Sequence, residues 1–286
     1  NIYDNTAKIK KYNNESGLLS DYYVGQKLGE IWGYVSDGYY TIDDFVLDDA
    51  KRDVWTLKEG VTSIQGVKVQ PGDEKFKDFD GDGVISSGAG TVSDPGDRKI
   101  IGNNRARFQF GANIGATYKG FSLDVRLQGV GKRDYWLSGS SIFPFAGSGS
   151  ADAVFQPLFS NQTDYWTAKS YDPENSDYMV AKNPNAKLFR IYDQGNNVGS
   201  NTRVSDKYLQ NAAYLRVKNI TLGYTLPRHW VKHVLMESAR IYVSVENLGT
   251  ISNLPKGYDP EGNTNNAIVW DYPYYRTISI GANITF

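Results

Sequence analysis

The sequence contains no cysteine among its 286 residues. Disulfide bonds, thiolate nucleophiles and cysteine-ligated zinc sites are therefore excluded. Basic side chains are not in excess either, because 31 Lys and Arg stand against 32 Asp and Glu. A broad nucleic-acid-binding surface needs a surplus of positive charge, so the composition argues against a nucleic-acid partner.

Long apolar runs are also missing. The mean hydropathy is −0.50, and no stretch approaches the roughly 20 apolar residues that a membrane-spanning helix requires. This excludes a helical membrane protein but leaves a transmembrane β-barrel open, because barrel strands alternate and look polar on average. The chain starts at Asn1 without a signal peptide, so we expect a processed N-terminus or a start inside a longer gene product.

What the sequence does have is aromatic residues, at 14%, and 29 glycines, a composition that favours β structure. Residues 277–286 alternate strictly between apolar and polar, as a strand with two unlike faces does. The same period runs through 107–118 and 121–130, and the two-residue turn between them predicts a hairpin. Further strands are predicted over 240–248 and 213–225, with a β-bulge near Lys218 and Asn219, where the apolar face changes phase.

These strands are about ten residues long, enough to cross a bilayer when tilted. Their polar faces carry Gln, Asn, Arg and Asp, which suit a wet lumen better than a dry core. The connections alternate between short or medium ones, at 119–120 and at 226–238, where one short helix is expected, and long ones, at about 42–104, 136–212 and 249–274. Outer-membrane barrels show this alternation, with their long loops outside the cell. The pattern predicts an all-β fold of antiparallel transmembrane strands, with a soluble β-sandwich as the alternative.

Several motifs carry a resemblance to one family. "YLRVKNITLGYTLP" (214–227), "GDEKFKDFDGDGVI" (72–85), "DRKIIGN" (97–103), "KGYDPEG" (256–262) and the terminal "ISIGANITF" resemble the C-terminal part of SusC/RagA-type TonB-dependent transporters of Bacteroidota outer membranes. The stretch 22–41 also looks like the barrel sequence of that family. The resemblance covers nearly the whole chain from about Tyr22 onward.

The resemblance implies a twenty-two-stranded barrel with an N-terminal plug and a TonB box, neither of which is recognisable here. We therefore expect residues 1–286 to be the C-terminal part of such a barrel. The family implies import of glycans or peptides with a SusD-type surface lipoprotein and energy from the TonB complex, and no enzymatic activity. Phe286, which ends the last strand near the periplasm, is the expected assembly signal in the outer membrane.

The acidic loop in "FKDFDGDGVIS" (76–86) is the strongest candidate site. Asp78, Asp80, Asp82 and the Val84 carbonyl match the first ligands of a calcium-binding hand, but Ala89 stands where the closing carboxylate belongs. The resemblance implies a shorter loop closed by an Asp before Arg. Here that Asp is Asp97, displaced by an insertion rich in Gly and Ser at 86–96, with Asp94 as its rival. Because all these donors are hard oxygens, calcium is the expected ion. The other interpretation is an acidic turn that solvent alone stabilises.

Two alternatives to transport remain open. The first is a soluble, calcium-stabilised β-rich module that binds carbohydrate, and the second is a glycosidase built on carboxylate pairs such as Asp43–Asp44. Aromatic residues between 135 and 171 could stack on sugar rings, meet a lipoprotein partner or pack within their own loop. With the strands placed in a barrel, the acidic loop is expected on the extracellular side.

Overall fold

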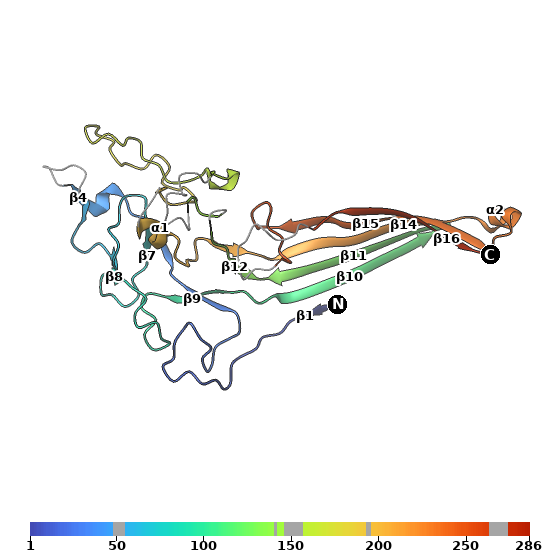
Figure 1. Cartoon of the computed structure of the whole chain (residues 1–286), viewed down its shortest axis with the longest axis horizontal. Helices are drawn as coiled ribbons and strands as arrows, with labels where there is room; N and C mark the ends of the chain where they lie inside the picture. The colour runs from blue at the N-terminus through green and yellow to red at the C-terminus, as the bar shows by residue number, and fades with distance from the viewer. Residues whose placement is uncertain (48–54, 140–141, 146–156, 193–195, 263–273) are drawn as a thin grey trace.

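The computed structural model describes residues 1–47, 55–139, 142–145, 157–192, 196–262 and 274–286. The molecule is elongated, with a sheet of long strands at one end and a region of short strands and loops at the other (Figure 1). We call these two parts the strand sheet and the loop region. Among the described residues, no helix is long and apolar enough to cross a membrane.

The strand sheet is antiparallel throughout, in the order β1-β10-β11-β14-β15-β16. Its members are β1 (Ile2–Tyr3), β10 (Arg107–Tyr118), β11 (Phe121–Lys132), β14 (Tyr214–Thr225), β15 (Ser238–Ser252) and β16 (Thr277–Thr285). The predicted strands are thus all present, and β15 is longer than the predicted 240–248. Short β1 and the long β16 lie at the two edges.

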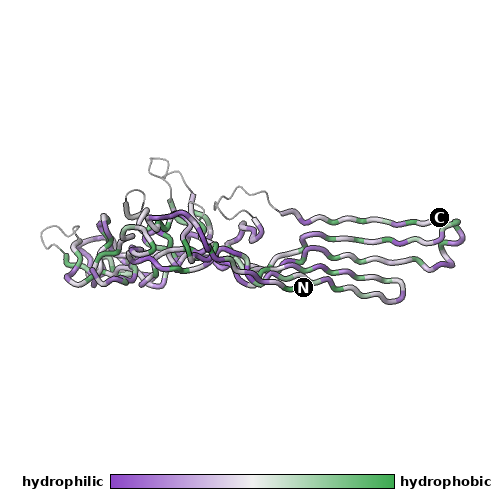
Figure 2. The backbone as a smooth tube through the Cα atoms, turned by 90° about the horizontal axis from the view of Figure 1, so that it is seen from below, coloured by the Kyte–Doolittle hydropathy of each residue, from purple (hydrophilic) through white to green (hydrophobic). Residues whose placement is uncertain are grey.

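The pairing register places apolar side chains beside apolar ones and polar or small residues beside one another across five strands. One row contains only apolar side chains, Ala116, Leu123, Leu222, Val243 and Ile280. The adjacent row on the opposite face contains Gly115, Asp124, Thr221, Ser244 and Ser279. Figure 2 shows the resulting alternation of hydrophobic and hydrophilic residues along the strands. The sheet is therefore two-faced, as the period-two pattern predicts.

The predicted bulge is confirmed at Lys218. Residues Asn219 and Val217 pair with the consecutive residues Arg126 and Leu127, so Lys218 is the extra residue of β14. Without this extra residue the polar and apolar faces would exchange, because a shift of one residue turns every side chain over. Because of the bulge, Val217 before it and Ile220 after it both lie in the apolar face.

Short connections join the strands at the end far from the loop region. Lys119 and Gly120, both with positive φ, form the tight turn between β10 and β11. The 226–238 connection contains the predicted short helix, as α2 (Arg228–Val231) followed by a 3-10 turn (Lys232–Val234). The C-terminus lies at this same end (Figure 1).

The loop region is built from short strand pairs. They are β2 (Glu30–Gly33) with β9 (Lys99–Asn103), β3 (Ser36–Tyr39) with β7 (Glu74–Phe76), β4 (Phe45–Leu47) with β5 (Trp55–Leu57), β6 (Ser63–Ile64) with β8 (Val84–Ile85), and β12 (Asp134–Trp136) with β13 (Leu209–Asn211). Among the described residues, two 3-10 turns (Ile42–Asp44 and Ser160–Gln162) and α1 (Asn196–Asn201) also belong to it.

Residues 22–41 form no strand of the strand sheet, contrary to the expectation of barrel sequence there. They contribute β2 and β3, each of four residues, which pair within the loop region. Gly25, Gly29 and Gly38 have positive φ, and such residues interrupt a continuous strand. The segment is therefore part of the loop region.

Two apolar clusters hold the loop region together. One includes Tyr40, Phe76, Ile85 and Trp166, and the other includes Tyr135, Phe143, Phe189 and Tyr208. The aromatic residues between 135 and 171, for which internal packing and ligand or partner contact were both left open, therefore divide into two groups. Tyr135, Phe143 and Trp166 pack internally, whereas Phe159 and Tyr171 are exposed, and Phe155 lies outside the described residues.

Candidate functional site: the acidic loop and its surroundings

The acidic loop lies between β7 and β9 in the loop region, and β8 is part of it. Gly81 and Gly83 both have positive φ, which lets the chain turn back on the carboxylate of Asp78. That carboxylate accepts hydrogen bonds from Gly81 N at 2.6 Å and from Gly83 N at 2.8 Å. The glycines of "GDG" thus form the turn and point two backbone donors at the first acid.

Asp97 lies against this turn despite its distance in sequence. It is fully buried, and its two carboxylate oxygens accept from Phe79 N and Ser86 N, each at 2.8 Å. Carboxylate oxygens of Asp78, Asp80 and Asp97 come within 4.8 Å of one another. The structure therefore brings together three of the predicted ligands, and it brings Asp97 across the 86–96 insertion as predicted.

Asp82 and Asp94 are not in this group of three. The Asp82 carboxylate accepts from Val84 N at 2.7 Å, which closes its own turn. Asp94 accepts from Ala89 N at 2.8 Å and so closes the inserted segment instead. Asp94 therefore does not take the place of Asp97.

The carbonyl of Val84, the predicted backbone ligand, lies between two carbonyls that are already used. Gly83 O accepts from Ser63 N, and Ile85 O accepts from Gln65 N, both in the pairing with β6. Successive carbonyls of a strand point in opposite directions. The Val84 carbonyl consequently points away from β6.

The electrostatics of the three acids differ. Hydrogen bonds from the backbone N–H groups of Gly83 and Gly81 lower the pKa of Asp78. Although the N–H of Asp82 acts to lower it, the pKa of Asp80 is raised overall by desolvation and by repulsion from Asp97, Asp82 and Asp78. Charge repulsion of this kind is what a bound cation relieves.

A second charged group lies where the strand sheet meets the loop region. Arg216 of β14 is 2% exposed and contacts Asp259 at 2.5 Å and Glu261 at 3.2 Å. The bulge residue Lys218 contacts Glu261 at 2.6 Å. These ion pairs hold the "DPEG" segment onto the polar face of the sheet. The ion pairs were not predicted from the sequence, although the Arg-x-Lys pattern at the bulge and the acidic "DPE" motif are complementary in charge.

A buried acid lies deeper in the loop region. Glu74 of β7 is fully buried, and neither of its carboxylate oxygens makes a hydrogen bond of normal geometry among the described residues. Burial raises its pKa to about 8, against the opposing influence of Lys207. Its backbone N–H donates to Asn201 at 2.6 Å, so β7 is tied to α1 at this point.

Phe286 follows directly after β16 and is exposed. It lies at the end of the sheet that carries the short turns, opposite the acidic loop (Figure 1). The two sequence-predicted features therefore lie at opposite ends of the molecule.

Comparison with known proteins connects this architecture to one class. The chain is 28% identical over 277 residues to TonB-dependent receptor P3 of Formosa agariphila, and the alignment covers 92% of this chain and 22% of that protein. It is 26% identical over 215 residues to TonB-dependent receptor SusC of Bacteroides thetaiotaomicron, and this alignment covers 75% of this chain and 18% of SusC. No protein-family model matches the chain.

Among solved structures, the chain superimposes on part of the RagAB peptide importer in the 'open-open' state. The TM-score is 0.51 at 19% identity, over 90% of this chain and 22% of that chain. The predicted resemblance to SusC/RagA-type TonB-dependent receptors is thus confirmed, and the fold is that of part of their barrel. The chain spans about a fifth of the length of the curated relatives it matches.

Proposed function

We propose that this chain forms part of the wall and outer loops of a TonB-dependent transporter of the outer membrane. The observation that carries the proposal is the continuous apolar face of the strand sheet. Ile114, Leu222, Val243 and Ile280 are each more than 40% exposed and lie in two adjacent rows across β10 to β16. Soluble proteins rarely expose a patch of this kind, whereas a barrel presents it to lipid.

The polar face then faces the lumen, and strands from the rest of the full-length receptor close the barrel against the edges formed by β1 and β16. The loop region, including the acidic loop, lies outside the cell, because the opposite end has the short turns typical of the periplasmic side. Phe286 at that periplasmic end serves as the assembly signal of the barrel. Deleting Phe286 alone should lower the yield of assembled barrel, and an unchanged yield would contradict this assignment.

The imported substrate is a glycan or a peptide, and the protein is a transporter rather than an enzyme. Similarity to receptors named TonB-dependent supports energy supply by the TonB complex. Similarity to SusC, together with the fold shared with RagAB, supports a SusD-like lipoprotein as the partner at the outer face.

Membrane fractionation and uptake test this function. The full-length protein carrying this chain should be recovered from the outer membrane only with detergent. Cells that express it should take up labelled oligosaccharide or peptide, and loss of TonB should abolish that uptake. Recovery of the native protein from the aqueous fraction would instead favour the soluble carbohydrate-binding module. Turnover of glycan by the purified protein would favour a glycosidase.

The acidic loop is proposed to bind a structural calcium ion through Asp78, Asp80, Asp82, the Val84 carbonyl and Asp97. The group of three carboxylates and the raised pKa of Asp80 support a cation there, and the all-oxygen donor set supports calcium. The ion would stabilise the outer loop and take no part in chemistry.

Asp80→Ala should remove this calcium and spare the turn, because the Asp80 carboxylate accepts from Asp82 N, whereas the Asp78 carboxylate accepts the hydrogen bonds from Gly81 N and Gly83 N that form the turn. Metal analysis of the purified protein should show one calcium fewer, and protease should cut the 78–97 segment faster. Asp94→Ala, in the same insertion, is the matched control and should leave the calcium content unchanged. Equal calcium content in the Asp80→Ala variant and the unmodified protein would contradict the proposal.

A further inference from the structure

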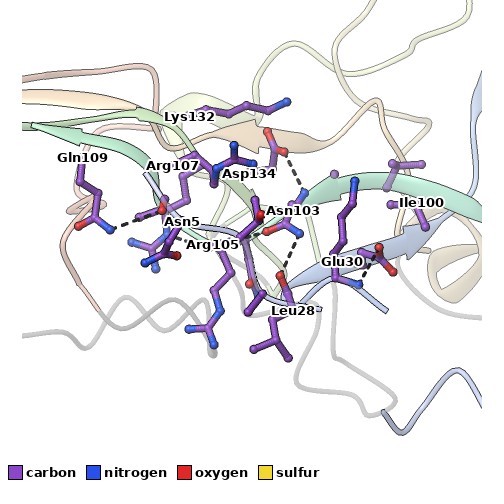
Figure 3. A pocket seen from close by; sticks show the side chains of 18 of the residues that line it. Asn5, Leu28, Glu30, Ile100, Asn103, Arg105, Arg107, Gln109, Lys132 and Asp134 are labelled. Atoms are coloured by element: carbon purple, nitrogen blue, oxygen red, sulfur yellow. Dashed lines mark hydrogen bonds between the residues drawn. The ribbon is translucent and has the colours of Figure 1, made fainter. Parts of the chain in front are cut away.

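A large pocket opens where the strand sheet joins the loop region. Its volume is about 950 Å³, and the N-terminal segment, β2, β9 and the adjoining ends of β10 and β11 line it. Figure 3 shows Arg107 and Gln109 of β10, Lys132 of β11 and Arg105 around this space. Arg107 and Lys132 are register partners on the polar face of the sheet, so the pocket belongs to the proposed lumen side at its outer end.

The pocket is strongly basic although the chain as a whole has a net charge of −1. Five cationic side chains line it, namely Lys27, Arg105, Arg107, Lys132 and Arg133. Of the acidic side chains in the described part of the chain, two do so, Glu30 and Asp134. Charge of one sign collected in a concave site concentrates ligands of the opposite sign.

Three of these cations have no ion-pair or hydrogen-bond partner for their charged groups within the described part of the chain, namely Lys27, Arg105 and Lys132. The other two are occupied. Arg107 makes a bidentate contact with Asp4, and Arg133 donates to the carbonyls of Asn104 and Pro260.

The two acidic side chains of the pocket, Glu30 and Asp134, each accept hydrogen bonds from neutral donors. Glu30 accepts from Tyr23 Oη at 2.7 Å and from Lys27 N at 3.1 Å. Asp134 accepts from Asn103 N at 2.9 Å. The positive charge of Lys27, Arg105 and Lys132 is therefore available to a ligand.

The remaining lining favours a hydroxyl-rich ligand over a peptide. Asn5, Thr6, Asn103, Asn104 and Gln109 supply amide and hydroxyl groups, and among the described residues no aromatic ring and few large aliphatic side chains line the pocket. A peptide of mixed sequence needs apolar subsites for its side chains. A ligand that is polar over its whole surface and carries anionic groups matches both the positive charge of the pocket and its amide and hydroxyl groups.

We propose that this basic pocket binds an oxyanion, carboxylate or sulfate, of an acidic oligosaccharide as it enters the transporter. The inference rests on the proposed function and names its substrate class. Lys27, Arg105 and Lys132 supply the charge, and the amides around them bind the sugar hydroxyls. Because the groups sit at the outer end of the polar face, the pocket lies on the way from the outer loops to the lumen.

Binding to the full-length protein, purified in detergent, tests the proposal by calorimetry. The probes are maltohexaose, sulfated maltohexaose, hexagalacturonate and a hexaglutamate peptide. We expect at least one acidic hexasaccharide to bind and neutral maltohexaose to bind at least about tenfold more weakly. Affinity should fall as salt is raised. The sulfated and uronate probes distinguish the two sources of the oxyanion.

The triple variant Lys27→Gln, Arg105→Gln, Lys132→Gln should lose about tenfold or more in affinity for the acidic hexasaccharide. The matched control is Lys58→Gln, Lys182→Gln, Lys187→Gln, which removes the same charge from exposed positions outside the pocket and should bind normally. Circular dichroism and gel mobility should show both variants folded.

Three results would overturn the proposal. They are equal affinity for charged and neutral hexasaccharides, tighter binding of hexaglutamate, and an unchanged affinity in the triple variant. The last would mean that another segment of the receptor fills the pocket. Each of them would leave TonB-dependent uptake intact, whereas failure of the proposed function would abolish uptake in the unmodified protein.

Discussion

The strand sheet and the loop region use the same kinds of residue in opposite ways. In the sheet, large apolar side chains lie on the outside, and Ile280 is 83% exposed. In the loop region, Trp166 and Phe76 are each 1% exposed and form a core. The sheet is held by hydrogen-bonded pairing between long strands, while the described part of the loop region contains short strand pairs and depends on aromatic packing.

Such a difference is expected where two solvents act on one chain, water on the loop region and, as proposed, lipid on the apolar face of the sheet. In water, the loop region must bury its own apolar surface to be stable. In lipid, the sheet gains nothing from burying its apolar face and must instead satisfy every backbone group by pairing. The following changes should therefore affect one region and spare the other.

Trp166→Ala should have the largest effect, about 3–5 kcal/mol of loop-region stability, because it leaves a cavity in a closed aromatic core. We expect faster proteolysis of the loop region with an unchanged shift of the heat-modifiable barrel band on gels. Phe159→Ala, which truncates an exposed aromatic of the same segment, is the control and should behave as the unmodified protein. Loss of the barrel band in Trp166→Ala would show that the two regions fold as one unit.

Ile280→Lys should destabilise the sheet by about 2–4 kcal/mol, as a cation facing lipid near the bilayer midplane does. The neighbouring Ser279→Lys puts the same charge on the polar face and should cost much less. Urea unfolding of the reconstituted protein in lipid vesicles measures both. Equal losses in the two variants would contradict a lipid-facing side for Ile280.

Glu74→Gln should have the smallest effect and change only the pH dependence of the loop region. Glu74 keeps its proton to about pH 8 in the folded state and loses it near 4.5 when unfolded. Stability should thus fall as pH rises through this window, by at most about 2 kcal/mol between about pH 6 and about pH 7.5.

In the Glu74→Gln variant that slope should disappear, since glutamine does not titrate. Hydrogen exchange of loop-region amides at several pH values measures it. Glu59→Gln, at an exposed position of the same region, should keep the slope. A slope that survives in Glu74→Gln would assign it to another group.

The strand sheet could be predicted almost completely from the sequence. Alternation in 107–118, 121–130 and 277–286 reflects a constraint that acts on every residue of a two-faced strand. The bulge at Lys218 was predictable for the same reason, because an apolar face that changes phase needs an extra residue. Strand ends were less certain, and β15 extends beyond the prediction to Ser252, where pairing with β14 continues.

The loop region could be predicted only in part. Asp97 was found near Asp78 and Asp80 through a family resemblance, since no local spacing connects residues across the 86–96 insertion. The pairing of Arg216 with Asp259 and the burial of Glu74 depend on contacts between distant segments, which leave no periodic signal. Residues 22–41 were expected to be barrel sequence from a family resemblance, which does not report the positive φ of Gly25, Gly29 and Gly38.

The bulge around Lys218 has a consequence for exchanging parts between related receptors. At this level β14 has one residue more than β11, and β15 has one more than β14, with Asn247 at positive φ. On the side of the bulge toward the loop region, the strands therefore pair in a shifted register. On the side toward the short turns, the apolar rows keep the original register. A chimera joined on the short-turn side of the bulge would receive the bulge, the loop region and the Arg216 ion pairs from one receptor. A chimera joined on the loop-region side would combine strand registers from two receptors in one sheet.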